Sequence, residues 1–244
     1  MMEEDLPRVI GFGASVVGQR HLSEGLSNQD AWLQTRGRFG FLQVVCDGLG
    51  SKKLAALGAK AATHAVREAV SRWHKAKFAP PNALIPLIEL YWRLRVVPHP
   101  ITDCATTCMF VLVLPNGEIQ IGALGDGLAL LENQKGVKVI HQARSEAFAN
   151  QTDHLGASHS RGQWTLEQHQ ISEIKTIMLM TDGIADDLLP DKHHEFVEWV
   201  RQKVQGVRPQ AGNARLRNAL NAWATPKSGD DKTLTILEIG AKNE

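Results

Sequence analysis

Residues 39–48 read Phe-Gly-Phe-Leu-Gln-Val-Val-Cys-Asp-Gly, an apolar run that ends in an acidic residue and a glycine. A short apolar run of this kind predicts a buried β-strand over residues 39–46. The carboxylate of Asp47 then follows a strand of the core, where a charged group needs a partner. The segment therefore predicts a strand that delivers a functional carboxylate at its end.

Other aspartates occupy similar positions in the chain. Residues 176–180 form a second short apolar run, and Asp182-Gly183 follows it closely. Three more aspartates stand at turns or strand boundaries: Asp30 in Asn-Gln-Asp, Asp126 in Gly-Asp-Gly and Asp230 in Gly-Asp-Asp. A single Asp-Gly is ordinary turn chemistry, so the inference depends on the whole ordered set.

Carboxylates that gather at one place repel each other and raise one another's pKa. Divalent cations placed among them would keep them ionised. An all-oxygen ligand set suits Mg²⁺ or Mn²⁺ better than zinc. The three cysteines, Cys46, Cys104 and Cys108, lack the spacing of a zinc site and are expected to be buried thiols in a reducing compartment.

The remaining pattern predicts an α+β fold. Apolar periodicity indicates strands over 8–17, 104–114, 118–124, 128–132 and 233–239, and helices over 54–73, 82–97, 192–205 and 213–224. Hairpin-like strands and paired helices favour antiparallel sheets covered by helices over a doubly wound parallel sheet. We expect a single domain over residues 1–244, with a polar flap over 142–172.

Composition limits the range of functions. The 244 residues are 43% hydrophobic and 22% charged, as in an ordinary globular protein. The net charge of +1 gives no general attraction to nucleic acid or to an anionic membrane. Because the sequence shows neither a signal peptide nor an apolar run of about 18 residues, we expect a cytoplasmic protein.

Several chemistries are excluded by missing motifs. No segment has the P-loop pattern, and Gly11-Phe12-Gly13 lacks the third glycine of a dinucleotide fingerprint. No arginine follows a cysteine by six positions, as a cysteine-nucleophile phosphatase would require. The Gly-x-Ser-x-Gly nucleophile elbow is also missing.

The ordered motifs resemble those of the metal-dependent Ser/Thr protein phosphatases of type 2C. They are Asn-Gln-Asp, Asp-Gly-x-Gly, Ala-Thr-Thr, Gly-Asp-Gly, Thr-Asp-Gly-Ile-Ala-Asp and Asp-Asp-Lys-Thr, and the match runs from Gly11 to Ile239. Residues 146–152 resemble a stretch of a compact bacterial-type subgroup. The resemblance implies two antiparallel β-sheets packed face to face with helix pairs outside, an α-β-β-α sandwich.

The resemblance also implies metal ligands. Asp47 would bridge two ions with help from the Gly48 carbonyl oxygen. Asp182 and Asp230 would complete the shell of one ion, and Asp30 would hold the other. Asp126 and Asp186 match a more weakly held third position. Two cations that share a water would lower its pKa, and the water would then attack phosphorus in line.

The implied function is hydrolysis of phosphoserine or phosphothreonine on a protein, with a kinase or its target as the partner in signalling. Two departures from the family pattern bear on this function. Leu49 stands where the family often has a histidine that is proposed to protonate the leaving alcohol. Arg20 and His21 lie further upstream than the family's phosphate-binding arginine, so either is a candidate to contact substrate phosphate.

Two alternative functions stay open. A catalytically weak or silent relative could bind phosphoprotein as a regulatory module, and Leu49 favours this alternative. A phosphatase of a small phosphorylated metabolite would need a closed pocket, whereas an open acidic site would favour a protein substrate.

Overall fold

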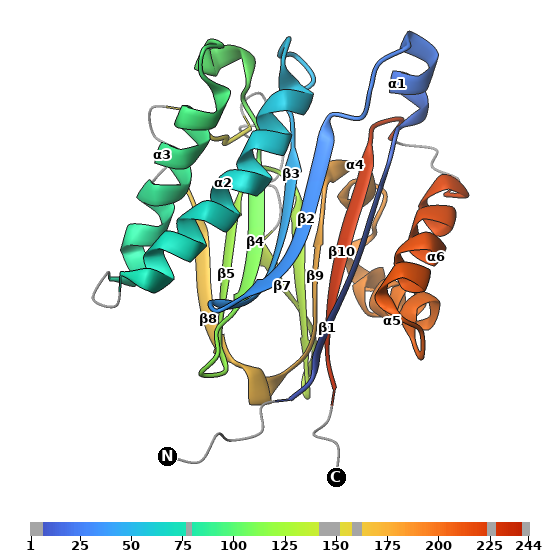
Figure 1. The fold of residues 1–244 in the computed structure, drawn as a ribbon. Helices are drawn as coiled ribbons and strands as arrows, with labels where there is room; N and C mark the ends of the chain where they lie inside the picture. Colours follow the sequence, from blue (N-terminus) through green and yellow to red (C-terminus); the bar gives the residue numbers. More distant parts are fainter. Residues whose placement is uncertain (1–6, 77–79, 142–151, 158–162, 224–227, 241–244) are drawn as a thin grey trace.

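The computed structural model describes residues 7–76, 80–141, 152–157, 163–223 and 228–240. Two five-stranded sheets pack face to face, and pairs of helices cover their outer faces (Figure 1). Every strand pairing within the sheets is antiparallel. The predicted α+β sandwich is therefore confirmed.

The first sheet has the strand order β1-β10-β9-β6-β7. Its strands are β1 (Val9–Val16), β10 (Lys232–Ile239), β9 (Ile174–Met180), β6 (Leu128–Asn133) and β7 (Gly136–His141). The second sheet has the order β2-β3-β4-β5-β8. Its strands are β2 (Asp30–Gly37), β3 (Gly40–Asp47), β4 (Cys108–Val113), β5 (Glu118–Leu124) and β8 (Thr165–Gln170).

The described residues form six α-helices, and two pairs of them make up the outer layers. The helices are α1 (Gln19–Glu24), α2 (Ala55–Lys75), α3 (Leu84–Val96), α4 (Asp182–Ala185), α5 (His193–Val204) and α6 (Pro209–Asn221). Short 3₁₀ helices cover Pro81–Ala83, Ile101–Asp103, Ile171–Glu173 and Pro190–Lys192. The pair α2–α3 lies over the second sheet and α5–α6 over the first (Figure 1). Within the described ranges, no helix is long and apolar enough to cross a membrane.

The strand β3 is apolar apart from Gln43 and its last residue, Asp47, because both of its faces are covered. Leu42 and Val44 pack into the cluster beneath α2 and α3. Phe41 and Val45 point the other way, into the cluster between the two sheets. A strand buried on both faces shows a continuous apolar run rather than alternation.

The small residues of α2 let it approach the second sheet closely. A Cβ built on Gly58 would lie 1.9 Å from the carbonyl oxygen of Cys104. The Trp92 indole of α3 donates a hydrogen bond to the Gly58 carbonyl oxygen at 3.1 Å. Cys46, Cys104 and Cys108 are free and buried, as expected.

The turn at Gly125-Asp126-Gly127 is not a hairpin turn. It joins β5 to β6, and these strands belong to different sheets. The chain therefore crosses from one sheet to the other at Asp126. Gly125 has a φ of +120° and lies against Thr107, so a side chain there would be both strained and crowded.

The expected flap over 142–172 is only partly described. Residues 142–151 and 158–162 lie outside the described residues. Residues 165–170 form β8, an edge strand paired with β5, so the expectation of a flap reaching 172 was wrong at that end. The sequence did not predict β8 because alternate side chains of this strand are exposed at the sheet edge, which makes its composition polar.

Candidate metal centre

The predicted aspartates converge at one end of the sandwich. Asp30 begins β2 and Asp47 ends β3, and the two residues are register partners. Asp182 begins α4 directly after β9, and Asp230 shortly precedes β10. Because antiparallel neighbours start and finish at the same edge, strand ends far apart in sequence meet here.

The centre of this group is a trio of carboxylates. Asp47, Asp126 and Asp182 each offer one oxygen, and these oxygens all lie within 4.8 Å of one another. The three residues and Asp230 line a pocket of about 430 Å³. Five predicted site residues from four separate stretches of the chain therefore line one cavity: Asp47, Gly48, Asp126, Asp182 and Asp230. Arg20, His21, Asp30 and Asp186 are not among its lining residues.

Burial and the charges of neighbouring aspartates raise the pKa of three carboxyl groups, those of Asp30, Asp47 and Asp182. Burial raises the pKa of Asp30 to about 8, with the charges of Asp231 and Asp182 adding to the effect. Burial and then the charge of Asp126 raise the pKa of Asp182 to about 6. The pKa of Asp47 is raised well above its usual value by burial and by the charge of Asp30.

Two oxygens of the group are ready to accept a ligand. Oδ1 of Asp30 and Oδ1 of Asp182 are buried and accept no hydrogen bond from the described residues. Buried carboxylate oxygens of this kind are normally paired or coordinate a metal. Because every donor here is an oxygen, the group fits Mg²⁺ or Mn²⁺.

Two threonines hold the end of β3. The backbone N–H of Asp47 donates to Thr107 Oγ1 at 2.9 Å. The Thr106 hydroxyl donates to the Asp47 carbonyl oxygen at 2.8 Å. These contacts satisfy the backbone at the strand end. Gly48 pairs with Thr106, and a Cβ on Gly48 would lie 2.3 Å from the Ala55 carbonyl oxygen.

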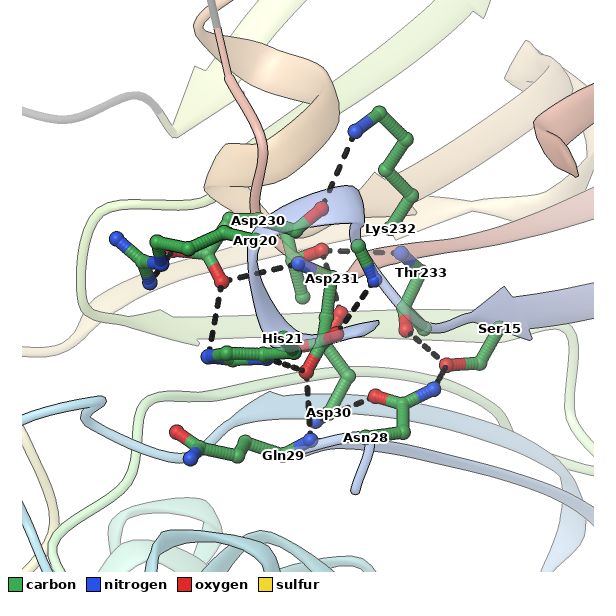
Figure 2. Close-up of polar contacts among 12 residues, drawn as sticks. Ser15, Arg20, His21, Asn28, Gln29, Asp30, Asp230, Asp231, Lys232 and Thr233 are labelled. Atoms are coloured by element: carbon green, nitrogen blue, oxygen red, sulfur yellow. Dashed lines mark hydrogen bonds and ion pairs between the residues drawn. The ribbon is translucent and has the colours of Figure 1, made fainter. Parts of the chain in front are cut away.

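The Asn-Gln-Asp motif orders the start of β2 (Figure 2). The Asn28 side-chain oxygen accepts from the Asp30 N–H at 2.9 Å, and its amide donates to Ser15 Oγ at 2.7 Å. The Thr181 hydroxyl donates to Asp30 Oδ2 at 2.9 Å. One carboxylate oxygen of Asp30 is therefore held in place while the other is left for a ligand.

Arg20 and His21 differ sharply in their surroundings. Figure 2 shows the Arg20 guanidinium against Asp230. Nη2 of Arg20 lies 2.7 Å from Oδ2 of Asp230, and the Arg20 side chain is 52% exposed. His21 is buried, and its Nδ1 lies 2.9 Å from Oδ2 of the equally buried Asp231. Of the two candidates for phosphate contact, only Arg20 is exposed to solvent.

Asp231 is a structural residue that the sequence reasoning missed. Its carboxylate accepts hydrogen bonds from the backbone N–H groups of Gly18 at 2.8 Å and Gln29 at 2.6 Å. It thereby ties β10 to both ends of the loop that carries α1. Asp231 is the second aspartate of the Asp-Asp-Lys-Thr motif, and only the first, Asp230, was predicted as a site residue.

The remaining predicted residues lie at the margin of the group. The Asp186 N–H donates to the Asp182 carbonyl oxygen at 2.9 Å, so Asp186 follows one helical turn later. Leu49 lines the pocket beside Gly48. The sequence reasoning did not assign Lys52, Thr152 and His154 to the pocket, which they also line.

Comparison with known proteins places these observations in a family. The model of the family described as Protein phosphatase 2C matches residues 17–221. No curated protein sequence matches the chain significantly.

Several solved structures share the fold. The serine/threonine phosphatase Stp1 from Staphylococcus aureus is 18% identical, with a TM-score of 0.67 over 99% of this chain and 98% of that chain. A bacterial serine phosphatase is 19% identical, with a TM-score of 0.66 over 97% and 100% of the two chains. RsbX in complex with magnesium is 15% identical, with a TM-score of 0.58 over 98% of each chain.

Proposed function

Because the chain belongs to the protein phosphatase 2C family, we propose that it hydrolyses phosphoserine and phosphothreonine on a protein substrate with divalent cations as cofactors. The observation that carries this proposal is the convergence of Asp47, Asp126 and Asp182 at one pocket. Without a cation, three carboxylates at this spacing repel one another. Burial and the charges of neighbouring aspartates raise the pKa of two of them, Asp47 and Asp182.

Two ions, Mn²⁺ or Mg²⁺, would be held by five groups, with Asp47 shared between them. The ligands would be the carboxylates of Asp30, Asp47, Asp182 and Asp230 and the carbonyl oxygen of Gly48. Asp126 and Asp186 would hold a weaker third ion. When bound, the cations supply an activated water and neutralise negative charge on the phosphoryl oxygens.

The chain's own residues orient these groups. Thr181 and Asn28 fix Asp30, while Thr106 and Thr107 fix the backbone of Asp47. Arg20 contacts Asp230 and is exposed, so its guanidinium can bind a phosphoryl oxygen at the pocket without moving far. The result is a preorganised set of charges around the position of the phosphate.

A protein substrate is favoured over a small metabolite by the exposed rim of the pocket. Gly50 and Ser51 line the pocket and are exposed. A phosphorylated side chain presented by a larger molecule can therefore reach it. The partner in this proposal is a phosphorylated protein, such as a kinase or its target in a signalling system.

The test is phosphate release from a phosphothreonine peptide, compared with a sugar phosphate, in Mn²⁺, Mg²⁺ or EDTA. The proposal predicts metal-dependent release from the peptide and little from the sugar phosphate. Preference for the sugar phosphate would contradict the protein substrate. Release from either substrate that persists in EDTA would contradict the metal centre.

The alternative is a silent module that binds phosphoprotein, which Leu49 favours because an aliphatic side chain cannot donate a proton. Calorimetry with the same peptide distinguishes the two functions. Peptide binding in Mn²⁺ without phosphate release would establish the silent module in place of the enzyme.

A further inference from the structure

The pocket needs a proton donor that Leu49 does not supply. Hydrolysis of phosphoserine or phosphothreonine expels an alkoxide, which leaves far more easily when a positioned acid protonates it. Leu49 lines the pocket next to Asp47 and Gly48 and has no proton to give. The proton would therefore have to come from another side chain of the described pocket lining.

His154 lines the same pocket from a different part of the chain. Its neighbour Leu155 forms an antiparallel bridge with Thr106, and Thr106 forms a second bridge with Gly48. The Leu155 N–H donates to the Thr106 carbonyl oxygen at 2.9 Å. These two bridges place the segment that carries His154 beside the end of β3, on the side where Leu49 lies.

A second anchor holds the segment from the other side. The Thr152 hydroxyl donates to Asp126 Oδ2 at 2.7 Å. Two residues on, Nδ1 of His154 lies 2.9 Å from the Leu155 carbonyl oxygen. Because a carbonyl oxygen can only accept, Nδ1 carries the hydrogen of this bond. The other ring nitrogen, Nε2, is then the atom available to carry a transferable proton.

The other hydrogen-bearing side chains of the pocket are less suited. Thr107 Oγ1 accepts from the Asp47 N–H, and the Thr152 hydroxyl is committed to Asp126. Lys52 and Ser51 also line the pocket, but an ammonium group and an alcohol hydroxyl both hold their protons more tightly than an imidazolium does. Among the described lining residues, His154 is the best-placed acid.

We propose that His154 is the general acid of the reaction, an inference that rests on the proposed function. The oxygen of water bonds to phosphorus while the bond from phosphorus to the seryl or threonyl oxygen breaks. The leaving oxygen keeps the electron pair of that bond and takes the proton from Nε2 of His154. The products are the free alcohol and inorganic phosphate, and neutral His154 regains a proton from solvent.

The test compares two leaving groups in His154→Gln and His154→Ala. p-Nitrophenolate leaves without protonation, whereas a threonine alkoxide does not. We expect His154→Gln to lose on the order of 100-fold in kcat on a phosphothreonine peptide and less than about threefold on p-nitrophenyl phosphate. The control is His169→Gln, which removes a histidine on β8 that contacts Glu167 and does not line the pocket; both of its rates should stay unchanged.

The ratio of the two rates separates the possible outcomes. An equal loss on both substrates would overturn the acid role, because a merely structural histidine would not distinguish leaving groups. Unchanged peptide turnover in both His154 variants would overturn it as well. Wild-type chain that hydrolyses neither substrate in Mn²⁺ would instead overturn the proposed function and the inference with it.

Discussion

Asp30 and Asp47 are register partners at the end of the β2–β3 pair, so two carboxylates face each other across adjacent strands. Burial raises the pKa of both groups, and the charge of Asp30 raises that of Asp47 further. Such a pair is unstable when both members are ionised and no cation is present. We therefore expect the stability of the protein to depend on pH and on metal together.

We expect the metal-free protein to lose stability as the pH rises. An unfolded aspartate releases its proton near pH 4, whereas the pKa values of folded Asp182 and Asp30 are about 6 and about 8. Between pH 4 and pH 8, these two carboxyl groups therefore bind more protons in the folded state than in the unfolded state. Their contribution to the free energy of unfolding is complete below pH 4 and is lost as the pH rises through 8.

Thermal unfolding in EDTA at pH 5.5 and pH 8 measures this effect. Mn²⁺ should raise the melting temperature more at pH 8 than at pH 5.5, because cations replace the protons. Equal Mn²⁺ shifts at the two pH values would contradict a carboxylate site.

Asp182→Asn should have opposite effects on stability and activity. Removing one charge relieves repulsion with Asp126 and Asp47, so the melting temperature in EDTA should rise. Loss of the metal ligand should lower kcat on a phosphothreonine peptide by on the order of 100-fold. Differential scanning fluorimetry and phosphate release measure the two effects.

The matched control is Asp187→Asn in the same segment. Asp187 Oδ2 accepts from the Trp223 indole, a bond that asparagine can also accept. This variant should keep its activity and gain no stability. If Asp182→Asn behaved in the same way, Asp182 would not be a ligand.

Arg20 and His21 should give contrasting phenotypes. Arg20→Ala removes an exposed side chain, so stability should change by less than about 1 kcal/mol, while kcat/KM should fall about tenfold or more. His21→Ala opens a buried site beside Asp231 and should cost about 1–3 kcal/mol of stability. Urea unfolding and steady-state kinetics on both variants measure the contrast; a reversed pattern would assign phosphate contact to His21.

Gly58→Ala should destabilise the packing of helix α2 over the second sheet. The added methyl group would meet the Cys104 carbonyl oxygen, and backbone cannot move aside easily. We expect a loss of about 2–3 kcal/mol, measured by urea unfolding. Gly240→Ala is the control, because its nearest heavy atom would lie 3.7 Å away. Equal stability of the two variants would show that α2 can shift.

The buried strands, and the carboxylates that follow them, could be predicted from the sequence because both leave local signals. The apolar run before Asp47 and the apolar run before Asp182 reflect strands covered on both faces. The strand β2 was missed because its side chains are mostly half-buried and mixed in character. The strand β8 was missed because it is an edge strand with alternating exposure.

The remaining site residues depend on long-range packing that leaves no local pattern. His154 reaches the pocket because Leu155 pairs with Thr106 and the Thr152 hydroxyl donates to Asp126. The sequence likewise did not predict that the chain crosses between the sheets at Asp126, because Gly-Asp-Gly resembles an ordinary hairpin turn. Such placements follow from the tertiary fold rather than from any segment alone.

The most direct test of the central claim is restoration of activity by Mn²⁺ in wild type and in Asp47→Asn. Both chains would be stripped with EDTA, dialysed and titrated with Mn²⁺, with phosphate release from a phosphothreonine peptide as the readout. The account predicts that wild type regains saturable activity and that Asp47→Asn stays inactive while remaining folded by circular dichroism. Full activity of Asp47→Asn, or wild-type activity that needs no added metal after stripping, would contradict a cation-dependent phosphatase centred on Asp47.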